Sequence, residues 1–164
     1  VVKFNPLTNV GWRVGTELYS ASSDCYLAFN PNNYNELYMC YNLRSVIYKL
    51  DLTTYEHTLV AGAYGTAGYA DGEASEALFK YPRQIAFDDD GTLYVADGGN
   101  HCIRAISPDG MVSTFAGMPE ASGYRDGVKE VALFNYCDGI ALDSKGNMYV
   151  ADMWNSLIRK IEIY

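Results

Sequence analysis

The stretch that decides the fold is Tyr94-Val95-Ala96-Asp97, followed by Asn100 and then by Ile103-Arg104-Ala105-Ile106. The same string returns 55 residues later, from Tyr149 to Ile161. At that offset, residues 62–109 and 117–164 are identical at 21 of 48 positions. A fixed period of this size indicates a repeat architecture, so each copy is expected to be one structural unit.

The repeat extends toward its own start and into the first third of the chain. Gly-Tyr-x-Asp-Gly at 68–72 returns at 123–127, and Ala-Leu-Phe-x-Tyr at 77–81 returns at 132–136. A weaker copy covers residues 15–61, in which Leu37–Tyr41 stands for Leu93–Asp97. A half copy opens the chain, because residues 1–5 and 12–14 parallel residues 47–51 and 58–60.

Each full copy contains four short runs typical of β-strands, which in the first copy lie at 84–87, 92–96, 103–106 and 112–116. The strings between them, Asp-Asp-Asp-Gly, Asp-Gly-Gly-Asn-His and Ser-Pro-Asp-Gly, favour tight turns. Four antiparallel strands in about every 50 residues is the pattern of a β-propeller blade. The sequence therefore predicts an all-β chain with an outer half-blade at 1–14, a divergent blade at 15–62, a blade at 63–117 and a blade lacking its outer strand at 118–164.

The segment between blades gives a different pattern. Asp71 and Asp126 could cap the N–H groups that follow them, and the alanines and leucines after them suit a helix. We therefore expect short helices in the inter-blade loops, at Glu73–Phe79 and Val128–Phe134. Phe79 and Phe134 are expected to be buried between blades.

These residues resemble NHL repeats, whose pattern includes Gly-x-x-Asp-Gly, Ala-x-Phe, Tyr-Val-Ala-Asp, Asn-x-x-Ile-Arg-x-Ile and Thr-x-Ala-Gly. Residues 62–117 carry nearly all of it, 118–164 carry it as far as the third strand, and 15–61 are degenerate. In the last copy Cys137 and Asp138 replace Pro82 and Arg83. The resemblance implies a toroidal β-propeller of the type found in bacterial surface or secreted proteins, of which this chain would hold about three blades.

A propeller usually needs at least four blades to close. We therefore expect the remaining blades of a longer propeller, or a second copy of the chain, to cover the open faces and the edge of the last strand, Ile158–Ile163. The chain has no initiator Met and no basic-then-apolar leader, which predicts a mature product, a fragment or a trimmed chain.

Composition excludes several classes of partner. The 164 residues include 20 acidic and 12 basic side chains, a net charge of −8, and the cations are scattered. Nucleic acid, including RNA, and anionic membranes are therefore poor partners. No apolar run approaches the length of a membrane span. The four cysteines do not align between copies, and Tyr26 is expected opposite Cys40, so free thiols are predicted rather than a Cys25–Cys40 disulfide.

The recurring polar residues are expected to be structural. Asp97 with Asn100, and Asp152 with Asn155, are predicted to close the turn between the second and third strands by bonding backbone N–H groups. Arg104 and Arg159 are expected to pair with a carboxylate or with carbonyls of a neighbouring blade.

Other polar strings that could suggest a metal site are weak signals. Asp88-Asp89-Asp90-Gly91 lacks the ligand spacing of a calcium loop. His57 and His101 occupy unlike places in their copies and do not form a zinc set. No catalytic, metal or cofactor site is predicted.

Recognition is expected from residues that do not repeat and that lie at one mouth of the central channel. Their side chains suit sugar or peptide binding by stacking and bidentate hydrogen bonds. The candidates are Asp24, Tyr26, Tyr41, Arg44, Arg83, Gln84, His101, Asp138 and Trp154.

The sequence favours a non-catalytic binding or interaction platform for a protein or carbohydrate ligand, located outside the cytoplasm (periplasmic, cell-surface or secreted). The alternative is a segment of a propeller lyase or hydrolase whose axial metal is held largely by residues outside this chain. Stoichiometric metal on the axis would distinguish the second hypothesis from the first.

Overall fold

The computed structural model describes residues 2–5, 10–13 and 24–162, and these form antiparallel β-sheets. Parts of three expected strands, namely Val1, Val14 and Ile163, lie outside the described residues, as do residues 15–23 of the expected divergent blade. No helix in the described part of the chain is long and apolar enough to cross a membrane.

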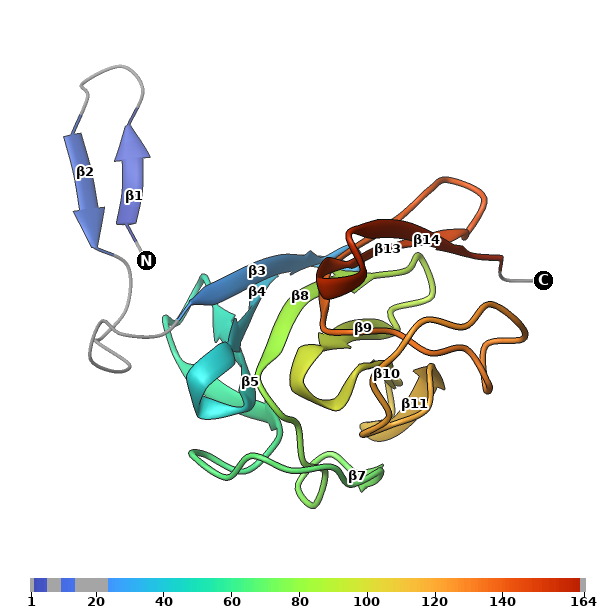
Figure 1. Cartoon of the computed structure of the whole chain (residues 1–164). Helices are drawn as coiled ribbons and strands as arrows, with labels where there is room; N and C mark the ends of the chain where they lie inside the picture. The colour runs from blue at the N-terminus through green and yellow to red at the C-terminus, as the bar shows by residue number, and fades with distance from the viewer. Residues whose placement is uncertain (1, 6–9, 14–23, 163–164) are drawn as a thin grey trace.

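The strands of the described residues group into four sheets (Figure 1). A hairpin joins β1 (Val2–Asn5) and β2 (Val10–Arg13), and a four-stranded sheet follows with β3 (Cys25–Asn30), β4 (Asn33–Tyr41), β5 (Val46–Asp51) and β6 (His57–Ala61). The next sheet has the order β7 (Gly72–Glu73), β11 (Met111–Ala116), β10 (Cys102–Ile106), β9 (Leu93–Asp97) and β8 (Pro82–Phe87). The last sheet contains β12 (Cys137–Leu142), β13 (Met148–Asp152) and β14 (Leu157–Ile161).

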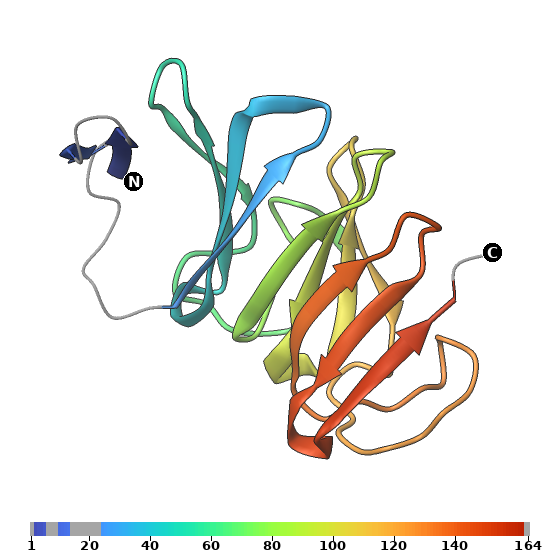
Figure 2. The ribbon, with the colours of Figure 1, turned by 90° about the horizontal axis from the view of Figure 1, so that it is seen from above.

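The three larger sheets stand side by side as propeller blades do. Seen from above, each is a twisted meander, and the first strands β3, β8 and β12 follow one another along one side of the stack (Figure 2). Strand β8 contacts both β3 and β12, so the first strands of the three sheets lie next to one another. The all-β propeller architecture is therefore confirmed, and it gathers the starts of β3, β8 and β12 in one region.

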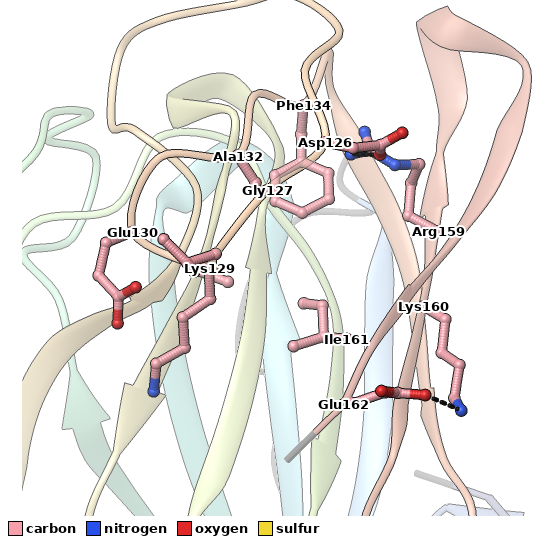
Figure 3. Close-up of a pocket in the computed structure, with 12 residues that line it drawn as sticks. Asp126, Gly127, Lys129, Glu130, Ala132, Phe134, Arg159, Lys160, Ile161 and Glu162 are labelled. Atoms are coloured by element: carbon pink, nitrogen blue, oxygen red, sulfur yellow. Dashed lines mark hydrogen bonds and ion pairs between the residues drawn. The ribbon is translucent and has the colours of Figure 1, made fainter. Parts of the chain in front are cut away.

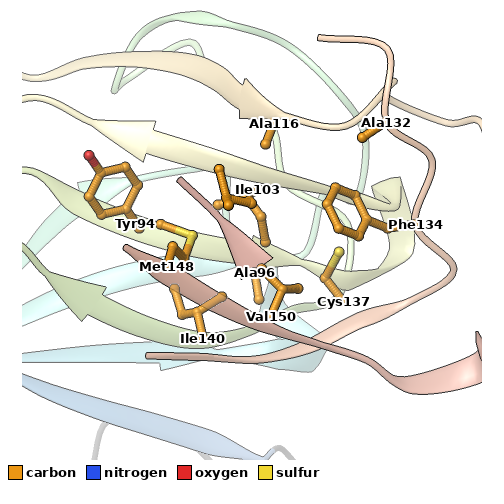
Figure 4. Packing of buried hydrophobic residues seen from close by; sticks show 11 residues of the cluster. Tyr94, Ala96, Ile103, Ala116, Ala132, Phe134, Cys137, Ile140, Met148 and Val150 are labelled. Carbon is orange, nitrogen blue, oxygen red and sulfur yellow. The ribbon is translucent and has the colours of Figure 1, made fainter. Parts of the chain in front are cut away.

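Apolar side chains hold each sheet against the next. Ile103 and Tyr94 of the middle sheet pack on Met148 and Val150 of the last sheet, in a cluster that Phe134 completes (Figure 4). An equivalent cluster with Phe79 joins the middle sheet to the first. Both phenylalanines are buried as the sequence predicts. Burial of β9 on both faces explains why its residues 93–96 are all apolar rather than alternating with polar residues.

The expected loop helices are wrong. Each expected helix is a single turn, closed by the N–H of Ala77 donating to the carbonyl of Glu73 at 2.9 Å and, in the next copy, by Ala132 donating to Val128 at 3.1 Å. The chain then folds back instead of continuing, because the Leu78 N–H donates to the carbonyl of Ala70. One turn fixes several dihedral angles for few hydrogen bonds, so the tertiary pairing prevails.

The structure contains 3₁₀ turns elsewhere, between the second and third strand of each larger sheet. They are η1 (Asn42–Arg44), η2 (Gly98–Asn100) and η3 (Met153–Asn155). Each ends at a residue with positive φ, namely Ser45, His101 or Ser156, whose N–H donates to the first carbonyl of the turn. These turns bring their side chains to the same end of the sheets as the starts of β3, β8 and β12, which we call the inner strands.

The β1–β2 hairpin has a register that reproduces a pairing elsewhere in the chain. Lys3 lies opposite Trp12, as Lys49 lies opposite Thr58 between β5 and β6. The sequence parallel between residues 1–14 and 47–60 is thus matched by the same strand alignment.

Candidate functional site

The repeated Asp, Asn and Arg form one hydrogen-bonded network in each of the last two sheets. Asp97 accepts hydrogen bonds from the backbone N–H of Lys80 at 2.8 Å, from Asn100 at 2.8 Å and from Arg104 at 3.0 Å. Arg104 is fully buried and also donates to Asp71 and to the carbonyls of Ala70 and Leu78. Burial raises the pKa of Asp97 to about 6, against the lowering effect of these hydrogen bonds.

The second copy repeats this geometry. Asp152 accepts from the N–H of Asn135 at 2.6 Å and from Asn155 and Arg159, each at 2.9 Å. Arg159 also donates to Asp126 at 2.6 Å. A network present in both sheets is scaffolding, as the sequence predicts.

One detail of that prediction is wrong. The aspartates do not accept from the backbone N–H groups of their own turns, which are closed by backbone bonds such as His101 N–H to Gly98 O at 3.2 Å. They accept from the backbone of the loop in front of the inner strand and from the side chains of Asn100 or Asn155. Arg104 does pair with carboxylates, those of Asp71 and Asp97, as one of the two predicted alternatives has it, and its carbonyl partners lie in that same loop. The network therefore fixes where each inner strand begins.

The inner strands β8 and β12 are irregular at their starts. Pairing between β8 and β9 shifts between Pro82 and Ile85, and pairing between β12 and β13 shifts between Cys137 and Ile140. Such bulges release residues from the ladder and redirect their side chains. The released residues are Arg83, Gln84, Asp138 and Gly139, and three of the four are sequence candidates.

Arg83 joins candidates from three successive sheets. Its Nε donates to Asp138 at 2.6 Å, and its Nη1 lies 3.1 Å from Asp24, just before β3. Partial burial lowers the pKa of Arg83, but the hydrogen bond and charge of Asp138 outweigh this and raise it. The guanidinium lies over the ring of Tyr26 at 5.1 Å and of Tyr136 at 5.9 Å.

Aromatic contacts continue from Tyr136 to the surface. Its ring stacks on Trp154 with centroids 4.6 Å apart and planes at 19°, and Trp154 is 59% exposed. We call Tyr26, Arg83, Tyr136 and Trp154 the aromatic row. His101 lies beside it, with its ring 6.5 Å from that of Trp154.

His101 holds the row in place through the backbone. Its Nδ1 accepts a hydrogen bond at 3.0 Å from the N–H of Tyr136, a residue with φ of 63°. An Nδ1 that accepts must be unprotonated, so the neutral imidazole is the form that makes this contact. Burial, helped by the charge of Lys80, lowers the pKa of His101.

Sequence reasoning missed Tyr136 and Gly98. Tyr136 repeats Tyr81, and repetition was the criterion for scaffolding. A side chain at Gly98 would lie 2.9 Å from the carbonyl of Cys137 and 3.2 Å from Cγ of Arg83, so only glycine lets these groups approach. The sequence does mark Gly98 as a position that differs between copies, because the corresponding residue of the last sheet is Met153.

The remaining candidates lie in different surroundings. Gln84 is exposed and extends along Gly139, where an added Cβ would lie 3.1 Å from its Oε1. Because Gly139 follows Asp138 in the chain, Gln84 lies beside the partner of Arg83. Tyr41 packs edge-on against Tyr48 in its own sheet, at 6.1 Å. Arg44 lies over Tyr64, 5.3 Å from the ring centroid. The structure therefore brings together seven of the nine candidates and gives Tyr41 and Arg44 other partners.

A separate hollow of about 690 Å³ lies at the far edge of the last sheet (Figure 3). Phe134 and Ala132 form its floor, and Arg159, Ile161 and Glu162 flank it. In the middle sheet, β11 occupies the corresponding space beside β10. None of the nine candidates lines this hollow.

The described residues also show how the possible metal ligands and the thiols are placed. Within them, no group of three or more His, Cys, Asp or Glu side chains could hold a metal ion. The four cysteines are free, with Cys25 exposed and the other three buried, and Tyr26 lies opposite Cys40 as expected. Burial raises the pKa of Cys137 and keeps that thiol protonated.

The fold and the repeated network define blades of a β-propeller, and comparison with known proteins identifies the family. The NHL repeat model matches residues 79–106. The chain is 35% identical over 136 residues to the Arabidopsis thaliana protein SUPPRESSOR OF QUENCHING 1, chloroplastic, which covers 78% of this chain and 13% of that protein. It is 39% identical over 85 residues to NHL repeat-containing protein 2 of Gallus gallus, covering 51% of this chain and 11% of that protein. The chain belongs to the NHL-repeat family.

Solved structures agree with this assignment. A Bacteroides thetaiotaomicron protein described as of unknown function superposes with a TM-score of 0.86 at 30% identity, covering 97% of this chain and 41% of that one. An auxiliary nutrient binding protein from Bacteroides ovatus gives 0.86 at 27%, covering 98% and 42%. A virginiamycin B lyase from Staphylococcus aureus, at 11% identity and a TM-score of 0.56, shares the fold alone. The chain spans less than half the length of each of these relatives and structures.

Proposed function

We propose that this chain is part of a non-catalytic binding platform, whose protein or carbohydrate ligand sits at the starts of the inner strands. One observation carries the proposal. Three charged residues that do not repeat, from three successive sheets, converge on one another beside an aromatic row whose outermost ring, that of Trp154, is exposed. Two of them sit in bulges, a device that natural sheets use to redirect side chains at binding sites.

The comparisons support the same proposal in a general way. Two similar propellers, from Bacteroides ovatus and Bacteroides thetaiotaomicron, are described as auxiliary nutrient binding proteins. By analogy we place this chain outside the cytoplasm. We also propose further propeller blades as the neighbours that cover the hollow beside β14, because the similar structures are more than twice as long.

The test is a binding screen followed by two matched variants. The whole chain is screened against peptides and oligosaccharides by thermal shift, and any hit is measured by calorimetry. Arg83→Met should remove binding, whereas Lys129→Met, which removes a cation from the ring of Phe115 at 4.6 Å on another surface, should not. Binding that survives Arg83→Met unchanged refutes this location.

Metal analysis addresses the alternative. The lyase or hydrolase hypothesis requires ligands from outside the described residues. Stoichiometric zinc or calcium in the full-length protein would support that hypothesis in place of a purely binding role.

A further inference from the structure

We propose that the ligand at the Arg83 site is a neutral saccharide whose ring stacks on Trp154, with its hydroxyl groups bound by Asp138, Arg83 and Gln84. This inference rests on the proposed binding function and names its ligand class. Three features of the site carry it: its charge, the free face of the aromatic row and the form of the strand edge.

Charge argues against an anionic ligand. Arg83 is the cation of the site, and it is already paired with two carboxylates, Asp138 and Asp24. The three groups together carry a net charge of −1, on a chain whose net charge is −8. A phosphate or uronate would meet a compensated guanidinium and a negative surrounding potential, whereas a neutral ligand meets no such penalty.

The aromatic row provides a rigid flat surface. The ring of Tyr136, which itself contacts the Arg83 guanidinium, stacks on the Trp154 indole from within the molecule, and more than half of Trp154 is exposed. An indole fixed in this way can bind the apolar C–H face of a sugar ring while losing little side-chain entropy. The corresponding residue of the middle sheet is Gly99, so this surface occurs in the last sheet and not in that one.

Planar polar groups lie next to the row. Asp138 uses Oδ1 for Arg83, and no described residue donates to its Oδ2. Arg83 donates one N–H to each carboxylate, which leaves further N–H groups of the guanidinium for a ligand. The exposed carboxamide of Gln84 adds a donor and an acceptor. Neighbouring sugar hydroxyls, which both donate and accept, match this mixed set.

The strand edge argues against an extended peptide. Peptides commonly bind sheets by adding a strand to an open edge. Here the edges of β8 and β12 are bulged at Arg83-Gln84 and at Asp138-Gly139, where the regular row of N–H and C=O groups is interrupted. Side-chain recognition of a compact ring suits this edge better than backbone pairing.

Calorimetry on the whole chain tests the inference with three sets of probes. These are neutral tetrasaccharides of glucose, mannose and xylose, a tetragalacturonate, and octapeptides rich in proline and tyrosine. We expect binding of at least one neutral tetrasaccharide, weakened about tenfold by Trp154→Ala, the scale of one stacking contact. Asp138→Asn should weaken it as well. Leu43→Ala, which truncates an exposed side chain at the corresponding place in η1, should leave it unchanged.

The outcomes separate this inference from the proposed function. Preferential binding of tetragalacturonate or of a peptide, weakened by Trp154→Ala, overturns the saccharide assignment and leaves the binding site in place. Binding of any probe that neither Trp154→Ala nor Asp138→Asn affects overturns both. Absence of binding to all three neutral tetrasaccharides also overturns the saccharide assignment. Because Trp154 is exposed, its truncation should leave Tm unchanged, and a lowered Tm would identify a structural role instead.

Discussion

Phe134→Ala is the perturbation that most directly tests how the blades are held together. The Phe134 side chain is 1% exposed and packs within the cluster between the middle and last sheets, next to Ala116 and Cys137 (Figure 4). The guanidinium of Arg159 lies 5.0 Å from its ring centroid. Truncation therefore removes apolar burial, leaves a cavity and takes away one face of this cation–π contact.

The expected cost follows from these contacts. Loss of a buried Phe side chain destabilises proteins by about 3–5 kcal/mol. The cation–π contact with Arg159 is worth about 0.5–1 kcal/mol, which is small beside this cost. Against a typical total of about 5–15 kcal/mol this cost is a large fraction, and it should lower Tm by about 10 °C. The measurement is urea unfolding followed by circular dichroism. Val131→Ala, an exposed change in the same loop, is the control and should cost less than about 0.5 kcal/mol.

A small effect would refute the reasoning. If Phe134→Ala cost less than about 1 kcal/mol, the loop before β12 would not be docked between the sheets. The twin change Phe79→Ala should cost at least as much, because Phe79 is fully buried and lies against the fully buried guanidinium of Arg104, at 5.1 Å.

Three further predictions concern the network, a turn and the mouth of the channel. Arg104→Met should cost about 3–5 kcal/mol in urea unfolding, because it leaves a buried carboxylate without its cation. Arg159→Met also removes the cation from a buried carboxylate but should cost less, since the Arg159 side chain is 10% exposed and that of Arg104 is fully buried; equal costs would contradict the role of burial. Gly117→Ala should destabilise the fold more than Gly110→Ala, although both glycines have positive φ, of 94° and 87°. A Cβ at position 117 would lie 2.9 Å from Phe134, whereas a Cβ at position 110 would meet no atom within 4 Å. The reverse order in thermal unfolding would contradict the packing at Gly117. His101 has a pKa below that of histidine in the unfolded chain, so its contribution to stability is complete above about pH 6.5 and declines as pH falls toward the folded-state pKa. Trp154 fluorescence should change over the same pH window, because the two rings lie close together. His101→Gln should abolish that change, and a transition that persists in this variant would assign it to another group.

Much of the site was within reach of sequence reasoning, and the part that was not has a clear cause. Arg83, Asp138 and Trp154 could be selected because they differ from their counterparts in the other copies. Tyr136 could not be selected in this way, since it repeats Tyr81. A repeated residue can serve both the scaffold and the site, and only the coordinates reveal which ring faces Arg83.

The loop helices show a second limit. The composition of residues 73–79 and 128–134 favours a helix, and each segment does form one turn. Asp71 faces Arg104 and Thr114 instead of capping that turn, and Leu78 pairs back with Ala70. Local propensity is worth a few tenths of a kcal/mol per residue, which is less than these charged and buried contacts.

The sequence by itself determined the blade, its four strands and the structural nature of the Asp–Asn–Arg set, because repetition at a fixed period reports what every copy needs in order to fold and stack. Only the tertiary structure decided that Arg83 binds Asp24 and Asp138 at once. Those three residues lie on different sheets, 55 and 59 positions apart in the chain, and their meeting depends on how the sheets are stacked and where the inner strands bulge. No local pattern encodes a contact that arises from the placement of one blade against the next.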